Sequence, residues 1–129
     1  MQERESVSYS VLVAEDDKII RRLARHILER AGFEVDEAAD GLEALAQIEK
    51  KKPDLLLLDI MMPHMNGYDV CTALREQEET ADLPIVIITA KTEKHAIQKG
   101  IDAGANRYLT KPLSPKILVE NVNEILGVS

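Results

Sequence analysis

A run of four leucines, Leu55–Leu58, followed by Asp59 and Ile60, constrains the fold of this chain more than any other segment. A continuous apolar run of this length is typical of a parallel strand that is covered on both faces of its sheet. Leucine also favours helices, so a helical fragment is the competing interpretation. Pro53 and Pro63 flank the run and leave too little length for a helix. The segment therefore predicts a central strand with an aspartate at its end.

Four further short runs, each apolar or alternating, occur along the chain and are followed by helical patterns. The predicted strands are 11–14, 33–38, 55–60, 84–89 and 107–110, and the predicted helices are 19–31, 41–51, 66–77, 92–103 and 114–126. The alternation predicts one doubly wound α/β domain with a five-stranded parallel sheet and five helices. The strand 33–38 alternates apolar and polar residues, which is typical of a sheet edge.

The apolar residues of three predicted helices recur at helical spacing. They are Ile19, Ile20, Leu23, Ile27 and Leu28 in the first helix, Leu42, Leu45, Ala46 and Ile48 on one face of the second, and Ile117, Leu118, Val122 and Ile125, expected to point inward, in the last. Gly32 is expected to close the first helix, and Ser114 before Pro115 is typical of the start of another. Cys71 is expected to be half-buried in its helix. The three histidines, His26, His64 and His95, are expected at the surface because they show no ligand spacing.

Composition excludes several functional classes. The formal charge of the 129 residues is −7, from 16 basic and 23 acidic side chains, which argues against direct binding of nucleic acid by this domain. No apolar run approaches the roughly 20 residues of a membrane helix, and the first ten residues lack the apolar stretch of a signal peptide. The single cysteine cannot form an intrachain disulfide. A cytoplasmic location without membrane contact is the resulting expectation.

Polar residues follow four of the predicted strands. Acidic residues, Glu15, Asp16 and Asp17, follow the first strand; Asp59 and Thr89 end the third and fourth; Lys111 follows the fifth. The carboxyl ends of parallel strands meet at one edge of the sheet, where ligands of such folds bind. Crowded carboxylates repel one another, so a cation is needed there, and Mg²⁺ suits a site with few carboxylates and several waters.

The same residues also have ordinary interpretations when each is taken alone. An acidic residue after a strand is commonly a helix N-cap, a Thr at a strand end a turn residue, and Lys-Pro a break in the chain. Together, however, they provide what an acyl-phosphate reaction requires: a carboxylate nucleophile, a metal site, a lysine and a hydroxyl. Their occurrence at four different strand ends favours a functional site.

Four segments with their spacing carry a resemblance to a known family. They are 11–17 (VLVAEDD), 58–67 (LDIMMPHMNG), 88–90 (ITA) and 108–112 (YLTKP). The chain resembles the response regulator receiver family of two-component signalling, chemotaxis receivers included, over about residues 9–126. The resemblance implies a flavodoxin-like sheet with strand order 2-1-3-4-5. Residues 1–8 are then expected to be a flexible N-terminus and 127–129 a C-terminal tail.

The resemblance also implies roles for the site residues. Asp59 would be the phospho-acceptor, with Lys111 and Thr89 as contacts of the phosphoryl group. Mg²⁺ or Mn²⁺ would bind Asp16, Asp59 and the backbone carbonyl of Met61, and Glu15 through water. Asp17 would be an N-cap, Tyr108 the switch aromatic that turns inward with Thr89, and the Lys111-Pro112 bond would be cis.

As such a receiver, the chain would take a phosphoryl group from a histidine kinase or a histidine phosphotransfer domain. It would then act as a signalling switch without a multiple-turnover substrate. The surface formed by 92–103, 107–110 and 114–126 would change with phosphorylation. Residues at Met61 and Lys91 tune phosphate lifetime in the family. An apolar Met61 and a Lys91 over the phosphoryl group predict slow self-dephosphorylation.

The output of the switch stays open at this point. Residues 91–116 carry six basic and two acidic side chains, which fits either a solvated face or a docking surface for an acidic partner. Asn106-Arg107 replaces the acidic pair that winged-helix regulators use in dimer salt bridges, so a monomer or a weak phosphorylation-dependent dimer is expected. The chain could be a single-domain regulator or part of a longer protein with an effector domain.

Three other classes of protein fit the sequence less well than a receiver does. A phosphatase of the haloacid dehalogenase type needs a second aspartate two residues after the nucleophile, and that position is Met61. A flavodoxin-like nucleotide binder needs a Gly/Ser/Thr-rich loop where this chain has acidic residues. A pseudo-receiver would lack one of the site residues, and none is missing.

Overall fold

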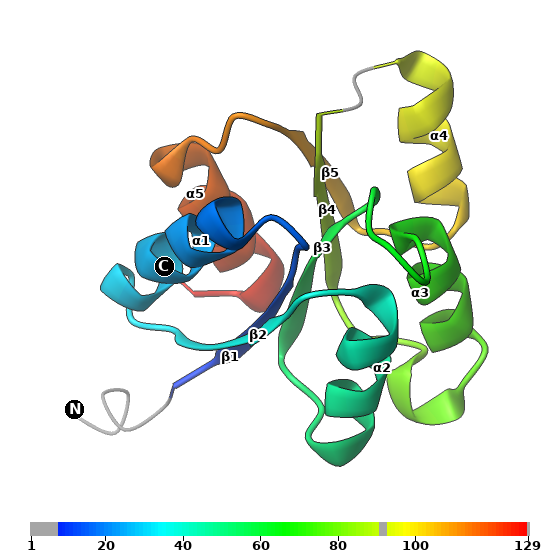
Figure 1. Ribbon diagram of the computed structural model, residues 1–129. Coiled ribbons are helices and arrows are strands. Elements are labelled where there is room, and N and C mark those ends of the chain that lie inside the picture. The colour runs from blue at the N-terminus through cyan, green and yellow to red at the C-terminus, as the bar shows by residue number, and fades with distance from the viewer. Residues whose placement is uncertain (1–7, 91–92, 129) are drawn as a thin grey trace.

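The structure is a computed structural model that describes residues 8–90 and 93–128. Within these ranges, five parallel strands form one sheet in the order β2-β1-β3-β4-β5 (Figure 1). The strands are β1 (Ser10–Ala14), β2 (Glu34–Ala38), β3 (Leu55–Asp59), β4 (Ile85–Thr89) and β5 (Arg107–Thr110). The predicted doubly wound sheet, its strand order and the edge position of β2 are confirmed.

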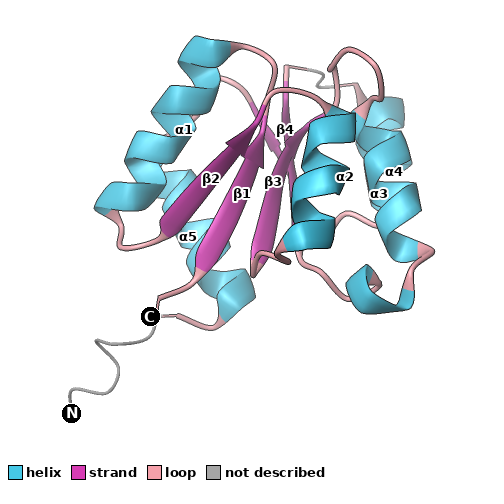
Figure 2. Ribbon diagram, turned by 60° about the horizontal axis from the view of Figure 1, so that its bottom comes forward, coloured by secondary structure: helices cyan, strands magenta, loops and turns pink. Residues whose placement is uncertain are grey.

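Helices cover both faces of this sheet. The helices are α1 (Lys18–Arg30), α2 (Gly41–Lys50), α3 (Gly67–Arg75), the short 3-10 helix η2 (Glu78–Thr80), α4 (Lys94–Asp102) and α5 (Pro115–Leu126). α1 and α5 lie on one face, and α2, α3 and α4 lie on the other (Figures 1 and 2). Because all five strands run parallel, their carboxyl ends lie at the same edge of the sheet.

The leucine run forms the central strand β3 and supplies both halves of the core. Leu55 and Leu57 pack with the apolar side chains of α1 and α5, whereas Leu56 and Leu58 pack with those of α2 and α3. All four are fully buried. Burying one leucine side chain stabilises a fold by about 2 kcal/mol. The strand that ends in Asp59 is thus anchored in the core on both faces of the sheet.

Local sequence signals set the helix ends next to that edge. The Asp17 carboxylate accepts hydrogen bonds from the N–H groups of Ile19 and Ile20, so Asp17 is the N-cap of α1 as expected. Gly32 follows the end of α1 with a φ of +99°, which glycine adopts without strain. Ser114 accepts from the Ile117 N–H at the start of α5, and the Lys111-Pro112 bond is cis.

One predicted core position is wrong, because Ile117 of α5 is 51% exposed. Three other apolar residues that recur at helical spacing are also exposed: Ile19 (80%), Leu42 (57%) and Leu23 (46%). Each residue of a helix turns about 100° from the last, so an apolar neighbour of a core residue can still lie outside the narrow stripe that meets the sheet. Cys71 was predicted to be half-buried and is fully buried. The three histidines are exposed, as predicted.

Candidate functional site

The carboxyl ends of the strands bring together the acidic edge, which we define as Glu15, Asp16, Asp59 and Lys111. The first two follow β1, Asp59 is the last residue of β3, and Lys111 follows β5. One carboxylate oxygen from each acid lies within 4.8 Å of the other two. The crossover topology therefore collects at one point residues that are up to 96 positions apart in the chain (111 minus 15).

Lys111 is the cation of this group. Its Nζ lies 2.8 Å from Glu15 Oε1 and 3.4 Å from Asp59 Oδ2. Although burial opposes it, hydrogen bonding to Glu15 and the charge of Asp59 raise the pKa of Lys111, so it stays protonated. One ammonium group faces three carboxylates, which leaves the acidic edge with a formal charge of about −2 when all are ionised.

The two inner carboxylates are removed from water. Glu15 is 1% and Asp59 is 3% exposed. Asp59 Oδ1 is buried and has no hydrogen-bond partner within the described residues. Burial, together with the charge of Asp59, raises the pKa of Glu15 from 4.5 to about 7, against the lowering effects of Lys111 and the Asp17 N–H. Such uncompensated oxygens fit a hard divalent cation that prefers oxygen ligands.

The backbone around Asp59 allows no side chain at one nearby position. Gly67 begins α3, and its N–H donates to the Ile60 carbonyl at 2.9 Å. A Cβ atom there would lie 2.5 Å from the Asp59 carbonyl oxygen, which is too close for any other residue. Gly67 lies in the segment 58–67 that carries the family resemblance, but the sequence pattern alone does not indicate this packing role. The close approach of α3 to β3 depends on it.

The remaining predicted site residues lie around this edge. Thr89 is fully buried at the end of β4, beside Thr110 in the register. Tyr108 is half-buried, and burial raises its pKa to about 12. A Cβ at Gly100 of α4 would lie 3.1 Å from the Tyr108 ring, so α4 and this ring are in close contact. The Met61 side chain is 58% exposed, and Lys91 lies outside the described residues.

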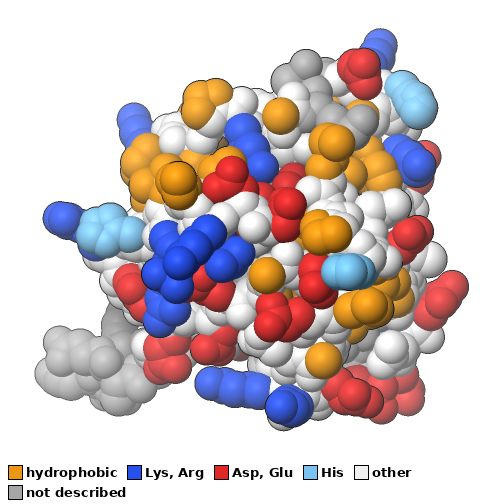
Figure 3. Space-filling view, in the orientation of Figure 1, with side chains coloured by type: hydrophobic (Ala, Val, Ile, Leu, Met, Phe, Trp, Pro, Cys, Tyr) orange, Lys and Arg blue, Asp and Glu red, His pale blue; other side chains and the backbone are white. Residues whose placement is uncertain are grey.

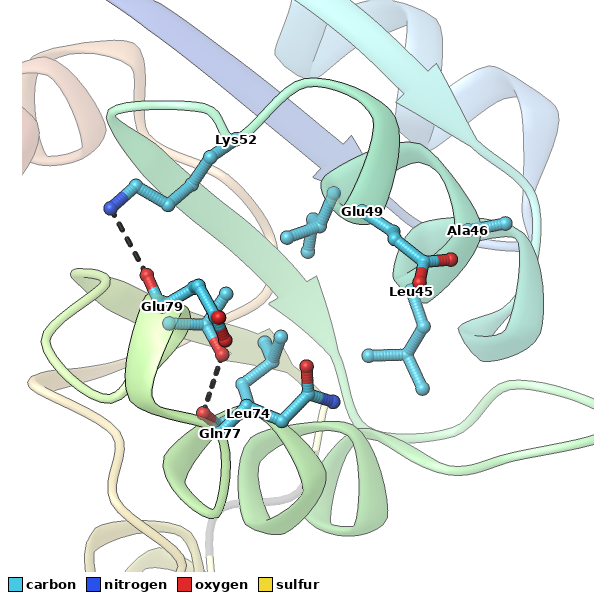
Figure 4. Close-up of a pocket in the computed structure, with 9 residues that line it drawn as sticks. Leu45, Ala46, Glu49, Lys52, Leu74, Gln77 and Glu79 are labelled. Atoms are coloured by element: carbon cyan, nitrogen blue, oxygen red, sulfur yellow. Dashed lines mark hydrogen bonds between the residues drawn. The ribbon is translucent and has the colours of Figure 1, made fainter.

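A separate groove of about 510 Å³ lies between α2 and the α3–η2 segment (Figure 4). Leu45, Glu49, Leu74 and Glu79 are among its lining residues. Lys52 Nζ donates to the Glu79 carbonyl at 3.1 Å. None of its lining residues belongs to the acidic edge, so the predicted chemistry is not located in this hollow.

A sequence profile described as the response regulator receiver domain matches residues 11–123. The chain therefore belongs to this family of two-component signalling proteins. The alkaline phosphatase synthesis transcriptional regulatory protein PhoP of Bacillus subtilis is 42% identical over 116 residues, which are 90% of this chain and 48% of PhoP. The phosphate regulon transcriptional regulatory protein PhoB of Pseudomonas aeruginosa is 39% identical over 120 residues, or 93% of this chain and 52% of PhoB.

Solved structures agree with this assignment. The chemotaxis protein CheY4 of Vibrio cholerae has a TM-score of 0.87 at 35% identity, covering 92% of this chain and 99% of CheY4. The receiver domain of the sensor histidine kinase PA1611 from Pseudomonas aeruginosa, with a magnesium ion coordinated in its active site cleft, has a TM-score of 0.87 at 27% identity, covering 94% and 99%.

The chain spans about half the length of the curated relatives it matches. Across residues 8–90 and 93–128, no helix has both the length and the apolar character that crossing a bilayer requires.

Proposed function

We propose that Asp59 accepts a phosphoryl group, in a magnesium-dependent reaction, from the phosphohistidine of a histidine kinase or a histidine phosphotransfer domain. The observation that carries the proposal is the Asp59 carboxylate itself. It is 3% exposed, with Oδ2 at 3.4 Å from Lys111 and Oδ1 without a hydrogen-bond partner among the described residues. An Asp59 oxygen attacks phosphorus, the phosphorus–nitrogen bond breaks, and the imidazole leaves with the bonding electrons.

The other residues of the acidic edge prepare this carboxylate for the reaction. Lys111 offsets negative charge at Asp59 and then contacts one oxygen of the phosphoryl group, while the Thr89 hydroxyl contacts another. Asp16, Asp59 and the Met61 backbone carbonyl would hold Mg²⁺ or Mn²⁺ directly, and Glu15 through water. When bound, the ion would supply positive charge for the phosphoryl oxygens. The PA1611 receiver with its magnesium ion supports this choice of metal.

Phosphorylation would then change the surface formed by α4, β5 and α5. A hollow of about 310 Å³ lies on this surface, and Ile97, Tyr108 and Ile117 are among its lining residues. Thr89 moves toward the phosphoryl group and Tyr108 turns inward, which repacks the contact between Tyr108 and Gly100. The exposed Ile117, which the sequence pattern had placed in the core, is available to a partner at this hollow.

The chain acts in this proposal as a switch and not as a multiple-turnover enzyme. Its output partner or effector domain carries acidic groups that meet Lys94, Lys99 and Lys116. Arg107 is engaged within the chain, because its Nη1 lies 2.8 Å from Asn121 Oδ1 and 2.9 Å from Glu124 Oε1. This pairing favours a monomer or a weak phosphorylation-dependent dimer over a dimer held through Arg107.

The phosphate on Asp59 is expected to be long-lived because Met61 offers no hydrogen bond to orient an attacking water. The variant Met61→Asn combined with Lys91→Glu should dephosphorylate faster. Release of phosphate from the purified phosphoprotein measures the rate. An unchanged half-life would contradict this part of the proposal.

The central test is incubation with acetyl phosphate, with Mg²⁺ or with a chelator, followed by intact mass measurement. We expect a gain of one phosphoryl group in the native chain that requires Mg²⁺ and is absent from Asp59→Asn. Asp82→Asn removes an exposed carboxylate elsewhere and should leave the gain unchanged. A phosphoryl group that still appears on Asp59→Asn, or none on the native chain, would overturn the proposal.

A further inference from the structure

Three arginines of α1 surround one carboxylate of β2. This arginine cluster consists of Arg21, Arg22, Arg25 and Glu37. The Glu37 carboxylate accepts from Arg21 Nε at 2.7 Å, Arg25 Nη1 at 2.8 Å and Arg22 Nε at 3.1 Å. Figure 3 shows basic side chains gathered over α1 and β2. Although burial opposes it, the three arginines lower the pKa of Glu37 to about 2, so it stays ionised.

Arg21 differs from the other two arginines in what its second nitrogen touches. Its Nη1 donates to the Glu15 carbonyl at 2.8 Å and lies 3.5 Å from the Asp16 carbonyl. Its side chain is 13% exposed, whereas that of Arg22 is 60% exposed. Arg21 therefore connects Glu37 on the edge strand to the backbone that carries the acids of the predicted metal site.

That backbone determines where the Asp16 carboxylate lies. Asp16 is exposed, and within the described residues its side chain has no hydrogen bond or ion pair. By contrast, Glu15 is held through its side chain, because Oε1 contacts Lys111 and Oε2 accepts from the Asp17 N–H at 3.0 Å. The Glu15 carbonyl belongs to the peptide group that precedes Asp16. Fixing that carbonyl fixes the origin of the Asp16 side chain.

We propose that Arg21, held in place by Glu37, is a positioning residue that orients the Glu15–Asp16 peptide and so sets the affinity of the acidic edge for Mg²⁺. The inference rests on the proposed function of the acidic edge. One Glu37 carboxylate is shared by three guanidinium groups, so the arginine cluster keeps a formal charge of about +2 (three minus one). Loss of the Arg21 charge alone would favour binding of a cation nearby, so weaker Mg²⁺ binding without Arg21 reports geometry and not net charge. Groups that orient metal ligands through a hydrogen bond act in this way at other metal sites.

The chain offers a matched control for the experiment. Arg21→Met removes the carbonyl contact and one bond to Glu37, whereas Arg22→Met removes one bond to Glu37 and leaves the carbonyl contact intact. Glu37→Gln keeps Arg21 but weakens the group that holds it. The dissociation constant of Mg²⁺, measured by calorimetric titration without any phosphodonor, should rise about tenfold in Arg21→Met and less than about twofold in Arg22→Met. Glu37→Gln should lie between them.

Phosphorylation by acetyl phosphate separates positioning from a merely structural role. In Arg21→Met the half-saturating Mg²⁺ concentration should rise about tenfold, while the rate at saturating Mg²⁺ stays within about threefold of the native chain. Arg21→Lys, which can still donate to the carbonyl, should recover part of the affinity. If Arg21→Met is too unstable to purify, the Mg²⁺ dissociation constants of Glu37→Gln and Arg22→Met are compared instead, and that of Glu37→Gln should be the higher.

The outcomes distinguish the inference from the function on which it rests. A native chain that binds Mg²⁺ and is phosphorylated on Asp59, together with equal Mg²⁺ affinities for Arg21→Met and Arg22→Met, would overturn the role of Arg21 alone. A native chain that takes no phosphoryl group would overturn the proposed function. Weaker Mg²⁺ binding in Arg21→Met with unchanged binding in Arg22→Met supports the inference.

Discussion

The acidic edge and the arginine cluster lie next to each other, and they shift the pKa of a carboxylate in opposite directions. In the arginine cluster three guanidinium groups surround one carboxylate, and the pKa of Glu37 falls to about 2. At the acidic edge one ammonium group faces three carboxylates, and burial raises the pKa of Glu15 to about 7. A carboxylate is thus fully paired with cations of the chain in the arginine cluster, whereas the carboxylates of the acidic edge have too few cations around them.

The difference indicates which region is built for an external partner. A charge that is taken out of water needs a partner to offset the cost, and in the arginine cluster Glu37 has three. The acidic edge instead buries Asp59 Oδ1 without a hydrogen-bond partner among the described residues. The acidic edge therefore carries negative charge that no group of the chain neutralises within the described residues. Such an excess of negative charge favours binding of a divalent cation.

Removing the single cation of the acidic edge should have the largest effect. Lys111→Met leaves Glu15 and Asp59 buried without their ammonium partner, and breaking a buried pair in this way costs about 3 kcal/mol of the free energy of unfolding. Denaturant unfolding at about pH 8 in a chelator measures the loss, with Lys116→Met as an exposed control. A loss equal to that of the control would mean that Lys111 offsets little of the charge.

Binding of Mg²⁺ at the acidic edge should change the free energy of unfolding by a slightly smaller amount. Mg²⁺ at about 100 times its dissociation constant should raise the free energy of unfolding by about 2.7 kcal/mol, because it binds the folded chain alone. Arg22→Met, which alters only the arginine cluster, should show the same gain. Asp59→Asn should show a smaller one, since a ligand is lost. Equal gains in Asp59→Asn and the native chain would place the cation elsewhere.

The sequence alone predicted the acidic edge better than the arginine cluster. The Leu55–Leu58 run defined a central strand, and the crossover rule then brought Asp59 and Lys111 to one edge without any knowledge of side-chain packing. Arg21 and Glu37 carried no such signal. Three arginines in one helix resemble a solvated face, and the contact to Glu37 depends on how α1 rotates over β2.

The burial errors have the same physical origin. Helical spacing identified an apolar stripe in α5 but not its width, so Ile117 was placed inside while the structure buries Leu118 and Val122. Local signals such as the Asp17 cap were predictable because both partners lie within four residues. Features that depend on the relative rotation of two elements were not.

Neutralising one carboxylate in each region should change stability in opposite directions. In a chelator, Asp59→Asn relieves repulsion between buried acids and should raise the free energy of unfolding by about 1 to 2 kcal/mol. Glu37→Gln weakens charge-assisted hydrogen bonds and should lower it by about 1 kcal/mol. Paired denaturant curves for both variants decide the matter. Two changes of the same sign would remove the contrast between the regions.

The smallest expected effect is the change in the free energy of unfolding as the pH is lowered, which should have opposite signs for Glu15 and Glu37. Without metal, folded Glu15 keeps its proton up to about pH 7, while the unfolded chain loses it near 4.5, so folding takes up a proton between these values. Stability should therefore rise by about 1 kcal/mol as the pH falls from about 8 to 5.5, and Glu15→Gln should abolish that rise.

Glu37 should respond to acid with the opposite sign. It stays ionised in the fold down to about pH 2, whereas the unfolded chain takes up its proton near 4.5, so stability falls between these values as acid is added. Glu37→Gln should flatten this lower limb and leave the upper one unchanged. A native chain whose stability fell steadily from about pH 8 to 3 would show that Glu15 is ionised as readily in the fold as in the unfolded chain. The acidic edge would then not be short of positive charge, and its need for an external cation would lose its electrostatic basis.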